Sequence, residues 1–165
     1  MVVRAAAVFD TSFWVHSFGV GLLPFVLHRH AVRYTPAVAM ELPERYPSGR
    51  EFWRLARVGE LEEVVPRGDQ VRRFGIGERE SINVALENRE WVLLWDDHRA
   101  YRMAASLGLH VLCTPLLVID LVRDGEIDAE EASRIEGELE RMKTVSPDLI
   151  AIARTLLAAM SGEHR

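Results

Sequence analysis

The stretch WVLLWDDHRAYRMAASLGLHVLC, residues 91–113, contains in order an apolar run, two acids, an amphipathic segment and a second apolar run. Its first apolar run predicts a strand that ends at Asp96 and Asp97. Residues 100–107 carry apolar side chains at helical spacing, and 109–113 predicts another strand. Strands that alternate with helices are typical of an open, mainly parallel sheet covered by helices, so we expect an α/β fold.

The same alternation continues on both sides of this stretch. Further strands are expected at 3–9, 31–34 and 61–65. A helix is expected after Asp10, and Pro24 and residues 28–30 disturb its pattern. Another is expected to begin with Thr35 as its N-cap. Further helices are expected near 51–57, from Glu78, and from Thr114-Pro115 to 124–125. Beyond that point, Asp128 with Glu131 forms a capping box, and Ser146-Pro147 opens a last helix over 149–160.

These elements predict a three-layer α/β/α sandwich with a mainly parallel central sheet. Residues 1–125 form the α/β domain, and 126–165 form a helical extension that packs on the same domain or on a dimer partner. A chain of 165 residues with 48% hydrophobic content suits one buried core.

Composition also limits the class of protein. A formal charge of −5 argues against a protein that coats nucleic acid without specificity, although local Arg clusters can still form a footprint. The lone Cys113 has no partner for a disulfide or a zinc site, which indicates a reduced, cytoplasmic protein. The start of the chain lacks a signal-peptide core, and the apolar segment 13–27 is too short and too interrupted to span a membrane.

Acidic residues recur where strands end or helices begin. They are Asp10, Glu41, Glu78, Asp96 and Asp97. Ligands of open α/β sheets gather beyond the carboxyl ends of the strands, so these side chains are expected to share one crevice. Converging carboxylates repel one another unless they are neutralised by Arg or Lys, partly protonated, or bound to Mg²⁺ or Mn²⁺. The metal interpretation accounts for the most residues, and one or two ions there could activate water for phosphodiester cleavage.

Four segments carry a resemblance to a known family. They are VFDTS at 8–12, TPAVAMEL at 35–42, FGIGERESINVALE at 74–87 and LLWDDHRAYRMAASLGLHVLCT at 93–114. Over residues 3–125 the chain resembles the PIN-domain family, which includes the toxins of VapBC-type pairs, and the last two segments resemble a subgroup with GxGE and DD motifs. The chain departs from the commoner toxin pattern in its second and third acids, which are Glu, in Trp95, which stands in place of a Thr, and in the helices after Gly125.

The resemblance implies a function and a set of site residues. The family's four acids fall on Asp10, Glu41, Glu78 and Asp97, with Asp96 as a neighbouring candidate, and its small hydroxyl falls on Ser12, with Thr11 beside it. The implied activity is Mg²⁺- or Mn²⁺-dependent cleavage of RNA, with homodimerisation and an antitoxin protein as partner.

Each acid also has an ordinary structural interpretation. Asp10 can simply cap a helix, Glu78 can complement a helix dipole, and one of Asp96 and Asp97 can form a strand-to-helix turn while the other binds metal. Glu41 can be an exposed helix residue. Their agreement as a set favours the metal site. Glu80, by contrast, is expected at the surface.

Basic residues are expected around the acidic crevice because it must accept a phosphate backbone. Arg73, Arg99 and Arg102 are the candidates, and we name Arg99 and Arg102 as substrate contacts.

The sequence and the resemblance together predict a metal-dependent endoribonuclease that is the toxin of a toxin–antitoxin pair. Two other functions are alternatives. The first is a noncatalytic PIN-like module that binds RNA or protein. The second is a phosphoacceptor signalling domain, which the chain supports poorly because only Asp69 follows the strand at 61–65. Residues 13–27 and 149–160 are the segments expected at subunit or partner contacts.

Overall fold

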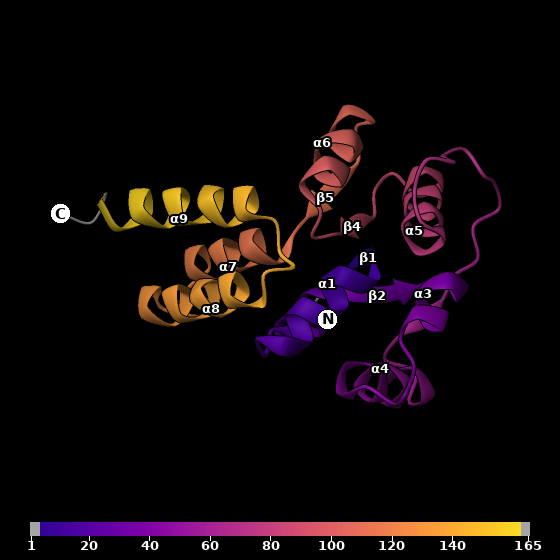
Figure 1. The fold of residues 1–165 in the computed structure, drawn as a ribbon, viewed down its shortest axis with the longest axis horizontal. Coiled ribbons are helices and arrows are strands. Elements are labelled where there is room, and N and C mark those ends of the chain that lie inside the picture. The colour runs from indigo at the N-terminus through magenta and orange to yellow at the C-terminus, as the bar shows by residue number, and fades with distance from the viewer. Residues whose placement is uncertain (1–3, 163–165) are drawn as a thin grey trace.

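The computed structural model describes residues 4–162, apart from the side chain of Ala100. A five-stranded sheet forms the centre of the molecule, in the order β3-β2-β1-β4-β5 with every neighbouring pair parallel (Figure 1). The strands are β1 (Ala5–Phe9), β2 (His30–Tyr34), β3 (Glu62–Glu63), β4 (Val92–Leu94) and β5 (His110–Leu112). The predicted mainly parallel α/β fold is confirmed. Val3, where the first strand was expected to begin, lies outside the described residues.

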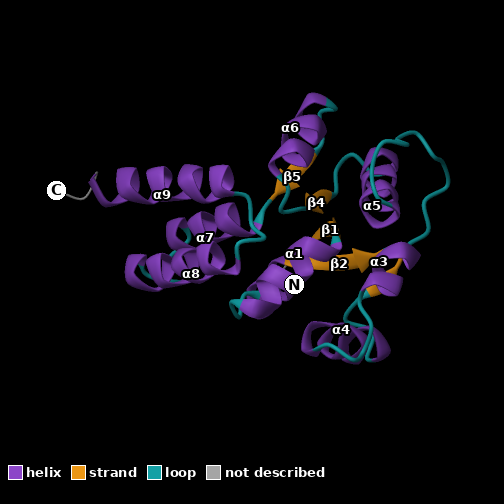
Figure 2. Cartoon of the chain, in the orientation of Figure 1, coloured by secondary structure: helices purple, strands orange, loops and turns teal. Residues whose placement is uncertain are grey.

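Helices connect and cover these strands (Figure 2). They are α1 (Thr11–Gly19), α2 (Leu23–Arg29), α3 (Pro36–Glu41), α4 (Pro47–Arg57), α5 (Ile76–Glu87), α6 (His98–Ser106), α7 (Thr114–Arg123), α8 (Ala129–Met142) and α9 (Pro147–Gly162).

Side-chain alternation along the strands divides the core between the two faces of the sheet. On β1, Ala7 and Phe9 join a cluster with α1, α4, α7, α8 and α9, whereas Val8 joins a second cluster with α5 and α6. On β4 the same alternation sends Leu94 to the first cluster and Leu93 to the second. Successive strand residues point to opposite faces, so the buried runs of the sequence produce three layers.

Several boundaries differ from the prediction. The expected helix after Asp10 is two helices, because the chain turns at Gly21 with a positive φ of 75°, and Pro24 lies in the first turn of α2 instead of breaking a helix. Helix α4 begins at Pro47, earlier than the predicted 51, and the strand predicted at 61–65 pairs only at Glu62–Glu63. Proline is favoured in the first turn of a helix because its missing N–H has no intrahelical partner there.

The three C-terminal helices α7, α8 and α9 pack against one another and project from one side of the sheet (Figure 1). Ile135 and Leu139 of α8 belong to the same apolar cluster as Phe9 of the sheet. Asp128 caps α8 by accepting a hydrogen bond from the Glu131 N–H at 2.8 Å, and Arg154 of α9 pairs with Glu140 of α8. Within residues 4–162, no helix has both the length and the apolar character needed to cross a membrane.

One acidic side chain is buried inside this helical extension. Glu136 of α8 is 1% exposed, and neither of its carboxyl oxygens has a hydrogen-bond partner among the described residues. Burial raises the pKa of the Glu136 carboxyl to about 8; Arg154 partly opposes the rise and the negative charge of Asp96 adds to it. Glu136 is therefore buried in its neutral form at neutral pH, and its ionisation is unfavourable.

Replacing Glu136 by Met is expected to stabilise the protein most at alkaline pH. A carboxyl whose pKa is raised on folding supports stability fully at acidic pH and loses that contribution as the pH rises through about 8. Wild-type stability should therefore fall by roughly 2–5 kcal/mol between pH 5 and pH 9 from this group alone. Urea unfolding of Glu136→Met at both pH values should show a smaller fall. Glu130→Met, at an exposed position of the same helix, is the control, and an equal pH dependence in wild type and Glu136→Met would contradict the assignment.

Candidate active site

The candidate site lies where the order of the strands reverses. Strand β1 pairs with β2 on one side and with β4 on the other, so the connections from these strands leave in opposite directions. In open α/β sheets, the carboxyl ends of the strands at such a point are where ligands bind. Asp10 follows β1 directly, and its backbone N–H donates to the Leu94 carbonyl of β4 at 3.0 Å. Asp96 and Asp97 follow β4 at the same edge. The sheet topology thus brings residues nearly ninety positions apart to one place.

Asp10 is buried at the N-terminus of α1. Its Oδ2 accepts hydrogen bonds from the Ser12 hydroxyl at 2.7 Å and from the Ser12 N–H at 3.2 Å, so Asp10 is also the N-cap of α1. Burial raises the pKa of the Asp10 carboxyl; the hydrogen bonds from Ser12 oppose the rise, and the negative charge of Glu41 adds to it. The cap and the functional interpretation of Asp10 are therefore compatible, because the cap bonds reach only one of its oxygens.

Glu41 reaches the same crevice from the last residue of α3. Its Oε2 accepts a hydrogen bond of 2.5 Å from the Thr11 hydroxyl, which fixes the carboxylate next to the start of α1. Gly77 of α5 lies against this carboxylate, and a Cβ at that position would lie 2.7 Å from Oε2 and 2.8 Å from Oε1. The absence of a side chain at Gly77 therefore leaves the space that the Glu41 carboxylate occupies.

Glu78 completes the group from the first turn of α5. Its Oε2 accepts a hydrogen bond from the Gly75 N–H at 3.2 Å, as in a capping box. Burial raises the pKa of the Glu78 carboxyl, and the negative charges of Asp10, Asp97 and Glu41 raise it further, against the Gly75 hydrogen bond. Four carboxyl groups from four separate segments thus influence one another electrostatically.

Helix α5 is held in place by polar residues that the sequence alone did not single out. The buried Ser81 hydroxyl donates to the Phe9 carbonyl at the end of β1, at 3.0 Å. Glu80, expected at the surface, is half-buried, and its Oε2 accepts from the Ala37 N–H in the first turn of α3 at 2.9 Å. The side chain of Asn83 accepts from the N–H groups of Gln70 and Val71 in the preceding loop. These contacts fix the helix that presents Glu78 relative to the strand that presents Asp10.

Asp96 differs from the other acids because its oxygens are already engaged. It is 3% exposed; Oδ1 accepts from the Thr114 N–H at 2.5 Å, and Oδ2 accepts from the Thr114 hydroxyl at 2.5 Å and from His16 Nδ1 at 2.7 Å. The other ring nitrogen of His16 lies 2.8 Å from the Thr144 hydroxyl, between α8 and α9. Helix α7 begins at Thr114, as predicted, with Cys113 as its N-cap, and Asp96 accepts the first N–H of that helix. Asp96 therefore joins β4, α1 and the C-terminal helices.

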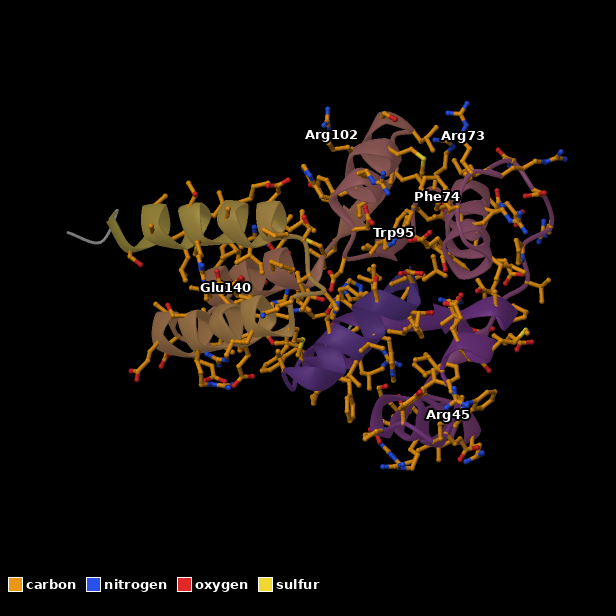
Figure 3. All side chains as sticks on the ribbon, in the orientation of Figure 1. Arg45, Arg73, Phe74, Trp95, Arg102 and Glu140 are labelled. Carbon is orange, nitrogen blue, oxygen red and sulfur yellow. The ribbon has the colours of Figure 1, made fainter. Side chains whose placement is uncertain are left out.

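Trp95 separates Asp96 from β4 and is almost fully buried on the other face of the sheet. Its ring packs edge-on against Phe74, with ring centroids 5.8 Å apart, and Figure 3 shows both between α6 and α5. Its indole Nε1 has no hydrogen-bond partner among the described residues. Trp95 thus fills the core next to Asp96. A large buried side chain stands where the commoner toxin pattern has the hydroxyl of a Thr.

The three Arg candidates differ in position. Arg99 lines a cavity of about 350 Å³ together with Asp97 and Lys143, so it lies near one of the four acids; Asp10, Glu41 and Glu78 do not line this cavity. Arg73 and Arg102 are exposed and point outward from the end of the molecule formed by α6 and the loop before α5 (Figure 3). Arg99 is therefore better placed than Arg73 or Arg102 to meet a phosphate next to Asp97.

The donor chemistry of the acidic crevice fits a hard divalent cation. Among residues 4–162, Asp10, Glu41 and Glu78 form no ion pair with Arg or Lys. Asp10 is buried, Glu78 is half-buried and Glu41 is exposed, and the charges of neighbouring acids raise the pKa of the Asp10 and Glu78 carboxyls. Carboxylate oxygens are the ligands that Mg²⁺ and Mn²⁺ prefer. As the described side chains stand, no three acidic, His or Cys groups are close enough to hold one ion.

Another cavity, of about 720 Å³, lies at the opposite edge of the sheet. Its walls include Ala5, His30, Val92 and His110, at the amino ends of four strands. Ligands of open parallel sheets bind beyond the carboxyl ends instead, so the size of this cavity does not move the candidate site.

The strands of this parallel sheet have the order β3-β2-β1-β4-β5, and acidic residues follow β1 and β4. These features define an α/β domain with the nuclease fold of PIN domains. Residues 6–152 match the family DUF3368, which is described as a PIN domain. The chain belongs to this family. Among solved structures, it is similar to the PIN domain endonuclease Utp24, with a TM-score of 0.52 and 12% sequence identity over 66% of this chain and 84% of that chain. This likeness concerns the fold. No curated protein matches the chain significantly.

Proposed function

We propose that this protein is a Mg²⁺- or Mn²⁺-dependent endoribonuclease. The observation that carries the proposal is the convergence of Asp10, Glu41, Glu78 and Asp97, three of them without a cationic partner among the described residues, at the strand ends of a PIN-type sheet. Carboxylates that repel one another, with Asp10 among them buried, are unfavourable in a folded protein, and such groups are typical of sites that bind a cation or perform chemistry.

The four acids would hold the ion or ions. When bound, a divalent ion supplies a water of lowered pKa and neutralises charge that develops on the phosphate. The Ser12 hydroxyl fixes one oxygen of Asp10, and the Thr11 hydroxyl fixes one oxygen of Glu41, so these two side chains orient the ligands. Asp96 positions the segment that carries Asp97 through its bonds to Thr114 and His16.

RNA is the proposed substrate. The resemblance of the four acidic segments to PIN nucleases supports it, and Utp24, whose solved structure is similar in fold, is a PIN domain endonuclease. Arg99 would contact a backbone phosphate beside the acids, with Arg102 as a more distant contact. The resemblance to the VapC-type subgroup also supports a role as the toxin of a toxin–antitoxin pair, with homodimerisation, an antitoxin partner and a cytoplasmic location as parts of the same proposal.

Two measurements on the purified protein test this function. The first is cleavage of a pool of structured and single-stranded RNAs with Mg²⁺ or Mn²⁺, against EDTA. The second is the melting temperature with and without the ion, because an ion that binds only the folded state stabilises it by about 2.7 kcal/mol at a hundred times its Kd. Metal-dependent cleavage with a raised melting temperature supports the proposal. Stabilisation by metal, or binding of RNA, without turnover would favour the noncatalytic module. The absence of metal stabilisation, RNA binding and cleavage would overturn both the nuclease and the noncatalytic module.

Replacing Gly77 by Ala is expected to weaken catalysis without weakening the fold. Ala is the better helix former by about 1 kcal/mol, but its Cβ would displace the Glu41 carboxylate that now lies within 2.9 Å of that position. Because ligand geometry governs metal affinity, we expect about a 10- to 100-fold loss of metal affinity or of cleavage. Gly137→Ala is the control, because a Cβ at this half-buried position of α8 would lie at an ordinary contact distance of 3.7 Å from Arg141 Nη1. Full activity of Gly77→Ala would show that Glu41 need not stay where it is.

A further inference from the structure

The connection between α8 and α9, residues 143–148, lies beside the segment that follows β4. A cavity of about 350 Å³ separates the two, with residues 96–99 in one wall and residues 143–148 in the other. Figure 1 shows this connection at the end of the helical extension nearest the sheet. Asp97, one of the acids assigned to the metal, is in the first wall, so the helical extension borders the candidate active site.

Two side-chain contacts hold this connection in place. The Thr144 hydroxyl lies 2.8 Å from His16 Nε2, and the other ring nitrogen of His16 lies 2.7 Å from Asp96 Oδ2. Farther along the connection, Asp148 Oδ2 lies 3.2 Å from His98 Nδ1. One contact thus joins the connection to the end of β4 through α1, and the other joins it directly to α6. Its position relative to the acids of the site is therefore fixed by the fold.

The first residue of the connection, Lys143, has an unfavourable backbone conformation. Its φ is 58°, and no other non-Gly residue of the described range has a positive φ. Helices commonly end on such a left-handed residue, but it is usually Gly, because a Cβ there costs roughly 1–2 kcal/mol. A cation near the C-terminus of α8 regains about 0.3–1 kcal/mol from the helix dipole, which offsets only part of that cost. Strain of this kind is typical of functional sites.

The Lys143 ammonium has no partner among the described residues. Its side chain is exposed and forms neither an ion pair nor a hydrogen bond with any of them. Glu140, one turn earlier in α8, is already paired with Arg154 through hydrogen bonds of 3.0 and 2.7 Å. Arg99, in the opposite wall of the cavity, is likewise exposed and unpaired within residues 4–162. Two cations without protein partners thus line the cavity, one from each wall.

The acids in the same walls do not neutralise these two cations. Asp96 is buried, and its oxygens are bonded to Thr114 and His16. Asp148 lies beside His98, and Asp97 is assigned to the metal in the proposed function. With a divalent ion bound at Asp97, the surroundings of the cavity favour an anion. A phosphodiester fits, since lysine binds phosphate as a compact point charge.

We propose that Lys143 binds a phosphate of the RNA substrate beside Asp97, with Arg99 on the other side of the same phosphate or its neighbour. The inference rests on the proposed function and deepens it, because it makes the helical extension part of the substrate-binding surface. The backbone of the RNA would then pass between the end of β4 and the α8–α9 connection. Phosphate contacts of this kind set the position of a nucleic acid without reading its sequence.

Replacing Lys143 by Gly separates binding from stability. Gly adopts the left-handed conformation without strain, so the melting temperature should not fall. Anisotropy of a short fluorescent single-stranded RNA, in EDTA to prevent cleavage, should show a slope of log K against log salt concentration that is smaller by about 0.7, the value for one phosphate. This slope corresponds to about 5-fold weaker binding at 0.1 M salt if the proteins bind equally at 1 M. The acids are the same in both proteins, so the difference in slope reports Lys143 alone.

Two variants control for charge and for position. Lys143→Arg keeps a cation at the end of α8 and should keep the wild-type slope. Arg141→Gln removes a positive charge from an exposed position of the same helix that does not line the cavity, and it should also keep the wild-type slope. A slope that falls equally in Arg141→Gln and Lys143→Gly would show an effect of net charge and would overturn the contact.

The composition of the chain allows a second measurement. Lys143 is the only lysine of the sequence, and every other residue among its 20 Lys and Arg is Arg. An amine-reactive acylating reagent therefore modifies Lys143 and the N-terminal amine of the purified protein, and mass spectrometry distinguishes the two products. Saturating RNA should slow the acylation of Lys143 relative to that of the N-terminal amine, which is the internal reference.

Three results would overturn this inference. They are an unchanged salt slope in Lys143→Gly, an equal fall in Lys143→Arg and Lys143→Gly, and acylation of Lys143 at the same rate with and without RNA. Failure of the contact and failure of the function are separable. Metal-dependent cleavage with none of these Lys143 effects would remove the contact and leave the nuclease, whereas Lys143-dependent binding without cleavage would keep the contact and remove the nuclease. A protein that neither binds nor cleaves RNA would remove both.

Discussion

Replacing Asp10 by Asn is expected to lower metal-dependent RNA cleavage about a thousandfold while the fold stays intact. A divalent ion contributes several kcal/mol of charge stabilisation to phosphate chemistry, and about 4 kcal/mol corresponds to a thousandfold in rate. Asn is as good an N-cap as Asp, and its carbonyl oxygen can still accept the two bonds from Ser12. The substitution therefore removes a charge from the site and not a support from α1.

The measurement is the single-turnover cleavage rate of one RNA at saturating Mg²⁺, with the melting temperature of each protein recorded with and without the ion. Asp69→Asn is the matched control, because Asp69 is an exposed acid whose ion pairs with Arg72 and Arg79 are solvent-accessible and worth little. In EDTA, Asp10→Asn should melt no lower than wild type, since a repelling charge is gone. Cleavage by Asp10→Asn within a factor of ten of wild type would exclude Asp10 as a metal ligand.

Replacing Asp96 by Ala is expected to lower the free energy of unfolding by about 3–5 kcal/mol, the cost of removing one partner from a buried charged network. Ala would leave the Thr114 N–H, the Thr114 hydroxyl and His16 Nδ1 buried without an acceptor. In a domain of this size, such a loss lowers the melting temperature by roughly 6–20 °C. Asp96 would then be a positioning residue whose removal loosens the segment that carries Asp97.

Thermal and urea unfolding measure this loss, with Asp69→Ala as the exposed control. Asp96→Asn should lie between wild type and Ala, because the amide keeps one acceptor oxygen but turns a donor toward either His16 or Thr114. A melting temperature for Asp96→Ala within about 2 °C of wild type would contradict the network as a source of stability. Direct ligation by Asp96 predicts the opposite pattern, a stable fold with lost metal binding.

Much of the fold could be predicted from signals carried by neighbouring residues in the sequence. The runs before Asp10 and Asp96 are continuous and apolar because their strands are covered on both faces. Thr35 and Pro36 mark the start of α3, because a capping hydroxyl followed by proline favours a helix N-terminus in any fold. The boundary errors came from the same kind of signal. Pro24 suits both a helix break and a first turn, and only the turn at Gly21 decides between the two.

The supporting shell of the site could not be predicted in this way. The His16 contacts to Asp96 and Thr144 join residues 80 and 128 positions apart, and Ser81 reaches Phe9 across 72 positions. A single sequence carries no pattern for such pairs, because each partner alone is an ordinary helix or loop residue. Gly77 likewise looks like a turn residue until its proximity to the Glu41 carboxylate is known.

The sequence by itself determined the class of fold and the acids at the strand and helix ends, because periodicity and capping are properties of neighbouring residues. Only the tertiary structure decided which of these acids influence one another electrostatically, as Asp10, Glu41 and Glu78 do, and which has its oxygens already bonded, as Asp96 does. The physical reason is that desolvation and charge interactions depend on distances through space, and parallel strands set those distances between segments far apart in the chain.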